Sequence, residues 1–255
     1  MDTLSTLVDA ALSIEKVRVR TQVRQSHLTL DGRHDPETDA LLEKLVSIED
    51  YVDGRTADII KGHPAHHWFS KVKGIGKENI GKVVGQIRVK PTKADDGTDL
   101  PYADTISALW KFAGYAVEAG HSMKRVKGEG KLHYNSQLRT MCWRLGSSLM
   151  KANGKFKEYY DQQKERSLDR CVALGVKVVP AASLPKDADG KKRETATCMS
   201  EGHIHNQALR KMVKLFLACL WLEWRRAEGL PVTKPYAIDV LNHNHFIDPW
   251  KMTDR

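Results

Sequence analysis

The stretch WFSKVKGIGKENIGKVVGQI, residues 68–87, places Gly-Ile-Gly between two short apolar patterns. Val72, Gly74, Ile75 and Gly76 fit apolar-x-Gly-apolar-Gly, the pattern of a tight turn between two helices, called a helix-hairpin-helix. We expect Ile75 to pack back between these helices, while glycine permits a positive φ and close approach of another backbone. N–H groups at the start of the second helix would then be free to hold a phosphate.

Four lysines surround this turn and favour the phosphate-binding interpretation: Lys71, Lys73, Lys77 and Lys82. A hairpin of this kind contacts one nucleic-acid backbone and reads no bases. In the alternative interpretation the turn is an αα-corner whose glycines only cap a helix. A dinucleotide-binding loop is disfavoured, because the spacing is G-x-G-x-x-x-x-G and no strand is expected before it.

The apolar periodicity predicts helices in nearly all other parts of the chain. Helices are expected at about residues 4–25, 40–60, 105–115, 135–152, 155–174 and 205–227, with an exposed linker at 180–198 and no strand. On the second of these helices, Leu41, Leu45, Ile48 and Val52 share one stripe. Trp110, Trp143, Trp221 and Trp224 are expected in the core, with stacking on nucleic-acid bases as the alternative. The predicted fold is all-α: a helical arm (residues 1–61), then a domain of residues 62–255 with the helix-hairpin-helix at about 66–88 and a helical bundle.

The charge is strongly positive and unevenly distributed. Lys and Arg number 41 against 32 Asp and Glu, a formal net charge of +9, and residues 121–166 hold eleven Lys or Arg against four Asp or Glu. Basic tracts are often only solvated faces of helices. The concentration of so much positive charge in one segment nevertheless favours a polyanionic partner, above all a nucleic acid.

Cysteine and histidine usage indicates an intracellular protein without a metal site. The four cysteines are scattered, which argues against a disulfide framework and for a cytoplasmic location. The start of the chain lacks the pattern of a signal peptide, and the longest apolar stretch, residues 215–222, is too short to span a membrane. The histidines in CMSEGHIH and LNHNHF do not show the paired spacing that is typical of zinc ligands.

Residues 113–139, AGYAVEAGHSMKRVKGEGKLHYNSQLR, resemble a signature of the insertion-sequence 110/116/902-type transposases. The C-terminal domain of that family has a hairpin, an Ala-Gly-Leu-like step, a Ser-Gly, a basic loop, and an Asn followed by Leu-Arg. The corresponding residues here are Ala113-Gly114-Tyr115, Ser122, the basic loop of Lys124, Arg125, Lys127 and Lys131, and Asn135 with Leu138-Arg139. The resemblance covers about residues 41–226. It departs from the family at Met123, where glycine is usual, and at Tyr-Ala-Val, which lacks the family's proline.

The resemblance implies DNA binding and serine-dependent strand transfer, with Ser122 as the candidate nucleophile. The candidate DNA-binding residues are Lys71, Lys73, Gly74, Ile75, Gly76, Lys77, Lys82, Lys124, Arg125, Lys127, Lys131 and Arg139. The family also has an N-terminal RuvC-like domain with four metal-binding acids, and only about 40 residues precede the matched region here. The resemblance therefore implies a truncated relative, or a subunit that needs a separate RuvC-like chain to supply the acids and a divalent metal. No cofactor is expected in this chain itself.

Further expectations follow from the same resemblance. They are a guide-type RNA as a partner, a homo-oligomeric state and association with the nucleoid. The alternative is a non-catalytic DNA- or RNA-binding protein that has been repurposed for genome maintenance or regulation. Whether the chain is an enzyme stays open at this point, because no residue that would activate Ser122 is evident in the sequence.

Overall fold

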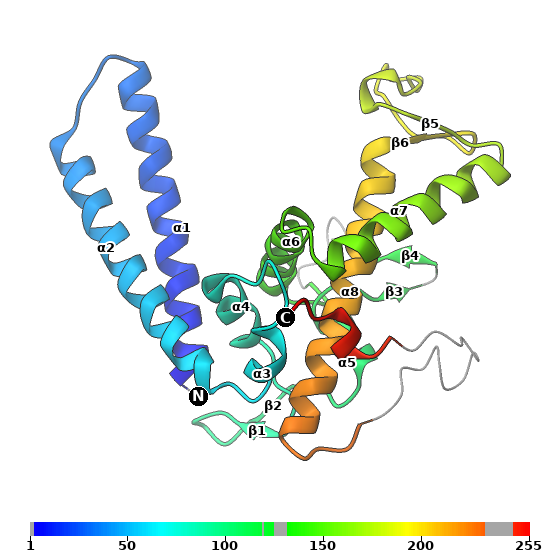
Figure 1. Cartoon of the computed structure of the whole chain (residues 1–255). Helices are drawn as coiled ribbons and strands as arrows, with labels where there is room; N and C mark the ends of the chain where they lie inside the picture. The colour runs from blue at the N-terminus through cyan, green and yellow to red at the C-terminus, as the bar shows by residue number, and fades with distance from the viewer. Residues whose placement is uncertain (1–2, 119, 125–131, 233–246) are drawn as a thin grey trace.

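Helices make up most of the structure, as the sequence predicts. The computed structural model describes residues 3–118, 120–124, 132–232 and 247–255. These segments contain eight α-helices: α1 (Thr3–Leu30), α2 (Pro36–Ile59), α3 (His66–Phe69), α4 (Lys77–Val84), α5 (Ile106–Phe112), α6 (Ser136–Lys151), α7 (Lys155–Ala173) and α8 (Glu201–Ala227). Three short 3-10 helices accompany them: η1 (Ile60–Gly62), η2 (Ala181–Ser183) and η3 (Pro249–Met252). The mostly helical class is thus confirmed (Figure 1).

Six short strands form three separate pairs, and the sequence prediction missed all of them. β1 (Thr92–Lys93) with β2 (Asp99–Leu100), and β3 (Val117–Glu118) with β4 (His121–Ser122), are antiparallel, whereas β5 (Lys177–Val179) and β6 (Cys198–Ser200) are parallel. Strands of two or three residues are too short to show the period-two alternation by which strands are recognised. The β5 and β6 strands bracket the segment that was expected to be a plain linker.

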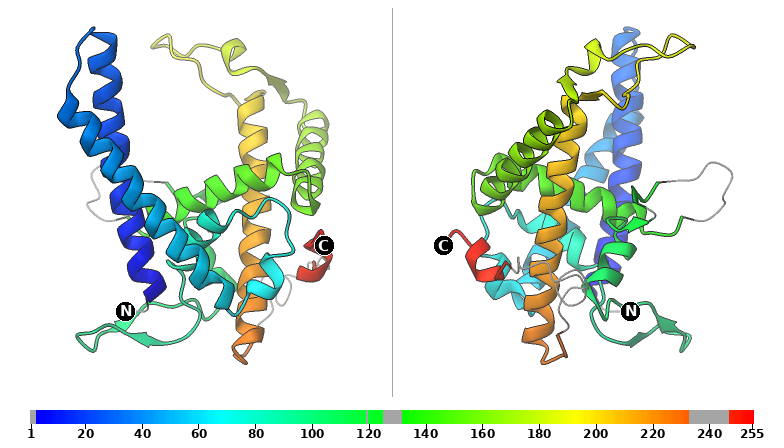
Figure 2. Two further views of the ribbon diagram at one scale, coloured as in Figure 1. Left: turned by 60° about the vertical axis from the view of Figure 1, so that its left-hand side comes forward. Right: turned by 90° about the vertical axis from the view of Figure 1, so that its right-hand side faces the viewer.

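The first two α-helices form an antiparallel hairpin, the arm, which projects away from the other helices (Figures 1 and 2). Arg18 pairs with Glu49 across the arm, and Gln25 donates a hydrogen bond to Asp39 at 2.7 Å. Of the stripe predicted on α2, only Val52 is buried, and the side chains of Leu41 and Ile48 are about half exposed. A two-helix arm has no third layer to cover the stripe, so Leu41 and Ile48 stay accessible to solvent.

The longest helix of the body is α8, which runs past α3, α5, α6 and α7 (Figure 2). Its apolar side chains form the centre of the core, where the Phe216 ring lies 5.7 Å from that of Trp68 and 5.5 Å from that of Phe156. Gly146 on α6 allows α8 to cross closely, because a Cβ there would lie 2.6 Å from a methyl group of Val213. This crossing brings the outer faces of α6 and α8 together above the core.

An internal ion pair fastens the arm to α4 and corrects one prediction. Lys82 was expected on the outer surface of the hairpin, but only 5% of it is exposed. Its ammonium lies 3.1 Å from a carboxylate oxygen of Asp53 and 3.6 Å from one of Glu15. Glu15 also pairs with Arg144 of α6. Lys82 therefore holds the arm in place and is not accessible to a phosphate outside the protein.

The Gly-Ile-Gly turn packs against α6. Gly74 has a φ of +91°, and a Cβ at this position would lie 2.6 Å from Cβ of Ala152 and 3.0 Å from the carbonyl oxygen of Ser148. The Ser148 hydroxyl donates a hydrogen bond to the Gly74 carbonyl at 2.8 Å. The backbone that closely approaches Gly74 is thus the protein's own. Gly76 has a φ of −80°, so the expected positive φ is wrong there, and its hydrogens face open space.

The C-terminal segment closes over the same turn. Asp254 accepts hydrogen bonds from the backbone N–H of Lys73 at 2.7 Å and from that of Lys155, the first residue of α7, at 2.8 Å. The Trp68 indole donates to the carbonyl oxygen of Pro249 at 2.9 Å. The Asp254 carboxylate thus accepts the Lys73 N–H and caps α7, which ties the C-terminal segment to the turn and to α7.

Candidate nucleic-acid interface

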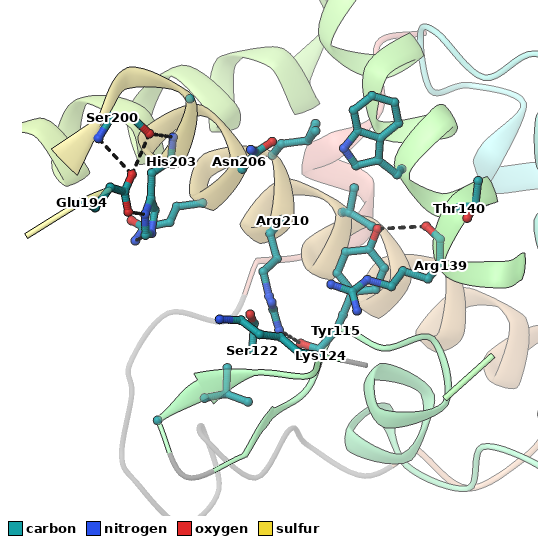
Figure 3. Close-up of a pocket in the computed structure, with 17 residues that line it drawn as sticks. Tyr115, Ser122, Lys124, Arg139, Thr140, Glu194, Ser200, His203, Asn206 and Arg210 are labelled. Carbon is teal, nitrogen blue, oxygen red and sulfur yellow. Dashed lines mark hydrogen bonds and ion pairs between the residues drawn. The ribbon is translucent and has the colours of Figure 1, made fainter. Parts of the chain in front are cut away.

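A cavity of about 1060 Å³ opens between β4, α6 and α8. Ser122 and Lys124 approach it from the β3–β4 hairpin, Arg139, Thr140 and Trp143 from α6, and a row of α8 side chains from the other wall. That row consists of His203, Asn206, Gln207 and Arg210, spaced i, i+3, i+4 and i+7, with Val213 beyond it. The fold thus brings together three of the predicted site residues, Ser122, Lys124 and Arg139 (Figure 3).

Arg139 is positioned by the segment that resembles the transposase signature. Gly114 has a φ of +73°, and a Cβ there would lie 2.7 Å from the Tyr134 ring and 3.0 Å from Cδ of Arg139. The Arg139 guanidinium lies over the Tyr134 ring, 5.0 Å from its centroid, and donates from Nη1 to the carbonyl oxygen of Met123 at 2.9 Å. Gly114 therefore makes room for the Arg139 side chain, and both residues belong to the segment that resembles the transposase signature.

Arg210 is a second fixed cation, which the list of candidate site residues omitted. Its Nη2 donates to the carbonyl oxygens of Tyr115 at 3.1 Å and Ala116 at 2.7 Å (Figure 3). Burial lowers the pKa of Arg210, and repulsion from Arg139 lowers it further. Its spacing from His203 and Gln207 along one helix face was a usable sequence signal, because a polar stripe opposite the apolar face of a helix marks a surface.

Ser122 and Lys124 lie at the mouth of the cavity. Ser122 is partly exposed and Lys124 is exposed. In the part of the chain that the structure describes, neither side chain has a hydrogen-bond or ion-pair partner. The other predicted residues of the basic loop, Arg125, Lys127 and Lys131, lie outside the described residues. Asn135 is the N-cap of α6, where its side chain accepts a hydrogen bond from the Leu138 N–H at 3.0 Å.

Glu194 is the one carboxylate among the described residues that line the cavity, and it is already engaged. It accepts hydrogen bonds from the N–H and hydroxyl of Ser200, the N-cap of α8, at 3.0 and 2.6 Å, and lies 2.6 Å from Nδ1 of His203. Burial alone would raise the pKa of Glu194, but the hydrogen bonds from Ser200 and His203 outweigh it and lower the pKa. The cations of the cavity therefore keep an unbalanced positive charge.

Trp143 is exposed, although the sequence prediction placed it in the core. About 51% of its surface is accessible, whereas the apolar stripe of α6 is buried. At 100° per residue, Trp143 lies roughly 150° from the centre of that stripe, so a helical wheel would have shown its outward position. The prediction for Trp221 and Trp224 is confirmed, because both are buried.

Further cations extend from the cavity along α8. Lys214 lies 4.0 Å from the centroid of the Trp110 ring. Burial lowers its pKa, and the neighbouring Arg210 adds to the effect. Burial also lowers the pKa of Lys211, with repulsion from Arg166 and Arg170 of α7. Repulsion between these like charges therefore disfavours their charged forms.

The remaining lysines of the Gly-Ile-Gly turn form a separate basic group. Lys71, Lys73 and Lys77 are exposed, and the Lys71 ammonium lies 4.8 Å from the centroid of the Trp250 ring. Ile75 is partly buried and packs against the core. The first turn of α4 has no side-chain cap. These residues do not line the cavity described above.

The described residues contain no group of three or more His, Cys, Asp or Glu side chains that could hold a metal ion. His203 is bound by Glu194, and Nδ1 of His205 lies 2.6 Å from the Tyr160 hydroxyl. The other two histidines of the sequence motifs, His243 and His245, lie outside the described residues. Within the described ranges, no helix has the length and apolar composition needed to cross a membrane.

Comparison of the chain with protein-family models, with curated proteins and with solved structures finds no match.

Proposed function

We propose that this protein binds DNA in the cavity between β4, α6 and α8, and acts in DNA transposition or recombination together with a separate RuvC-like chain. One observation carries the proposal. Ser122, Lys124 and Arg139, to which the transposase resemblance assigns strand transfer and DNA contact, line one cavity with Arg210. Ser122 and Lys124 come from the β3–β4 hairpin and the residues after it, Arg139 comes from α6, and Arg210 comes from α8.

The electrostatics of the cavity supports a phosphodiester as the ligand. Among the described residues that line the cavity, Lys124, Arg139 and Arg210 stand against one carboxylate, Glu194, which Ser200 and His203 already engage. Arg139 and Arg210 each donate to backbone carbonyl groups, so their side chains are held in place before a ligand arrives. Charge-assisted hydrogen bonds from such fixed guanidinium groups are short and strong, and phosphate oxygens accept them in pairs.

The chemistry proposed for the site is nucleophilic attack by Ser122. Its Oγ would form a bond to the phosphorus of a phosphodiester, while the bond from phosphorus to the leaving strand oxygen breaks and that oxygen takes up a proton. The serine proton passes to solvent or to a base on the partner chain. Cations placed against the non-bridging oxygens stabilise the charge that develops there. Lys124, Arg139 and Arg210 are suited to this task.

The divalent metal that the transposase resemblance implies would be held by the separate RuvC-like chain. The described residues of this chain offer no cluster of ligands that fits a metal ion, so no step is derived through a metal here. The contribution of this chain is binding, positioning and the hydroxyl group.

One observation favours a second candidate function, a non-catalytic DNA- or RNA-binding protein. A serine nucleophile needs a base or another activating group beside it. His203 is an imidazole on the cavity wall, but both of its ring nitrogens are engaged: Nδ1 lies against Glu194, and Nε2 lies 2.9 Å from the Gln207 amide. It is therefore not placed to activate Ser122. In this second function the cavity binds a nucleic acid for regulation or genome maintenance, and Ser122 has no catalytic task.

A salt series tests DNA binding at this site. The affinity for a labelled duplex is measured by fluorescence anisotropy for the native protein, for Lys124→Glu and for Lys44→Glu, a matched charge reversal on the exposed face of the arm. Each lost phosphate contact should reduce the slope of log affinity against log salt by about 0.9 on duplex DNA. We expect that loss for Lys124→Glu and no change for Lys44→Glu. Absence of binding by the native protein to this duplex and also to its separated strands, or an unchanged slope for Lys124→Glu, would overturn the proposal.

A further inference from the structure

We infer that the cavity accepts an unpaired nucleotide of a DNA strand, with its base stacked on Trp143 and its phosphate against Arg139 and Arg210. This inference rests on the proposed function, and it adds which form of DNA the site takes. The Trp143 side chain is not buried in the core and has no task in the proposed strand transfer.

Trp143 presents its indole to the cavity rather than to the core. It is about half exposed on α6, although Leu138, Met141, Cys142, Leu145 and Leu149 of the same helix are all nearly fully buried. Tryptophan is a large apolar side chain that normally gains stability from burial. No ring-to-ring contact involves Trp143 in the described ranges, and the indole lines the cavity. An indole in this position is available to a planar ligand.

The neighbouring cations determine what kind of planar ligand fits. Arg139 precedes Trp143 by four residues on α6, so the two side chains are neighbours on one helix face. Arg210 lies on the opposite wall, on α8. A nucleotide has a flat base and an attached phosphate, and the combination of an aromatic side chain with cations is what single-strand-binding proteins use for both parts.

Polar side chains on the wall suit the edge of a base. Asn206 is exposed, and its carboxamide has no protein partner among the described residues, which leaves two donors and one acceptor. Thr140 adds an exposed side chain beside Arg139, although its hydroxyl donates to the carbonyl oxygen of Ser136 at 3.0 Å. Asn206 therefore offers hydrogen bonds to a base edge that is no longer paired.

The geometry excludes the stacked interior of a duplex as the ligand for Trp143. Bases within a duplex are covered on both faces by their neighbours, so an indole can stack only on a base that has been unstacked or lies in a single strand. The volume of about 1060 Å³ lies just above the range of about 300–1,000 Å³ for small-molecule sites. There is room for an extruded nucleotide with part of its backbone.

Substitution of Trp143 tests this inference. Affinities for a single-stranded oligothymidine and for a duplex of equal length are measured by fluorescence anisotropy at one salt concentration. Stacking contributes about 1–3 kcal/mol per base, so Trp143→Leu should weaken single-strand binding by about 5- to 150-fold and leave duplex binding nearly unchanged. Trp143→Phe should retain most of the affinity, because it keeps an aromatic face. Tyr51→Leu changes an exposed aromatic residue of the arm, outside the cavity, and should have no effect on single-strand binding.

Two controls separate stacking from folding and charge. Thermal melting shows whether each variant is folded, and the exposed position of Trp143 predicts that Trp143→Leu is. An abasic oligonucleotide carries phosphates without bases, so it should bind the native protein and Trp143→Leu equally. An RNA strand that binds more tightly than its DNA counterpart would overturn the assignment to DNA.

The outcomes distinguish this inference from the proposed function. If the native protein binds neither single-stranded nor duplex DNA, both fail. If it binds DNA and Trp143→Leu binds the single strand as tightly as the native protein does, the unpaired-nucleotide site is wrong, while DNA binding through the cations stands.

Discussion

Arg139 donates a hydrogen bond from Nη1 to the carbonyl oxygen of Met123, 2.9 Å away, and so holds the residue directly after Ser122. The same guanidinium lies over the ring of Tyr134. One side chain of α6 thus fixes the position of the candidate nucleophile and contributes a positive charge to the cavity.

We expect Arg139→Lys to separate these two tasks. Lysine keeps the charge but not the planar fork that reaches Met123 from above Tyr134. Loss of a hydrogen bond from a charged donor should lower the free energy of unfolding by about 1.5–3 kcal/mol, measured by denaturant titration. Arg20→Lys, on an exposed face of α1, is the control and should change little. A stability loss no larger than that of the control would show that the contact with Met123 is dispensable.

The two glycines of the turn should respond differently to alanine. Gly74→Ala introduces a Cβ 2.6 Å from Cβ of Ala152 and forces alanine to a φ of +91°, which alone costs roughly 1–2 kcal/mol. Gly76→Ala points a methyl group into open space at a φ of −80°. Thermal melting should therefore show a large decrease in melting temperature for Gly74→Ala and none for Gly76→Ala.

The same pair of variants decides whether the turn binds DNA. Gly76→Ala remains folded in this prediction, so its DNA affinity can be measured without a stability effect. An affinity equal to that of the native protein would leave the turn with a structural role only. A clear loss would instead place a phosphate at the uncapped start of α4.

Lys82→Met should destabilise the protein by about 3–5 kcal/mol, the range for removal of one partner of a buried ion pair. The substitution leaves the Asp53 carboxylate without its cation at the junction of the arm and α4, while Glu15 keeps only its pair with Arg144. Lys77→Met, at the exposed start of α4, is the matched control and should be nearly neutral. Denaturant titration compares the two. Equal stability of both variants would contradict an attachment of the arm through Lys82.

Lys82 also shows what a linear pattern cannot reveal. Its partners lie 29 and 67 positions earlier in the sequence, and nothing near residue 82 indicates that the arm returns to cover it. The helices with strong amphipathic patterns were predictable, and α6 ends within a residue of its expected limits. The helix α1 extends to Leu30, beyond the expected end, because contacts with α2 such as that between Gln25 and Asp39 support a polar last turn.

The candidate site was predictable only in part, for a similar reason. Ser122, Lys124 and Arg139 lie within 18 residues of one another, so a local motif could suggest them together. Arg210 joins them through the crossing of α6 and α8 at Gly146, which is a tertiary contact. Trp143 could have been placed correctly by a helical wheel, but an aromatic residue in a helix is more often buried.

The stability of the first turn of α8 should depend on pH. Glu194 binds the N-cap Ser200 and has a pKa below its ordinary value, so its stabilising effect is present above the unfolded-state pKa of about 4.3 and is lost as the pH falls through the folded-state pKa. The difference in melting temperature between the native protein and Glu194→Gln should be constant above about pH 5 and decrease below that. A difference that does not change with pH would show that the ionised carboxylate is not responsible.

Ser122→Ala should leave DNA affinity nearly unchanged, since a hydroxyl adds little to binding that Lys124, Arg139 and Arg210 dominate. Purified native protein with Mg²⁺ should bind supercoiled and branched DNA and leave it uncut, because the acids of the RuvC-like domain are expected on another chain. Gel assays measure cleavage and any covalent protein–DNA adduct, with Ser147→Ala on α6 as the control. Robust cleavage by the isolated native protein would refute the need for a second chain. If that cleavage also persisted in Ser122→Ala, the serine would have no part in the reaction, and the nucleophile would have to be sought elsewhere.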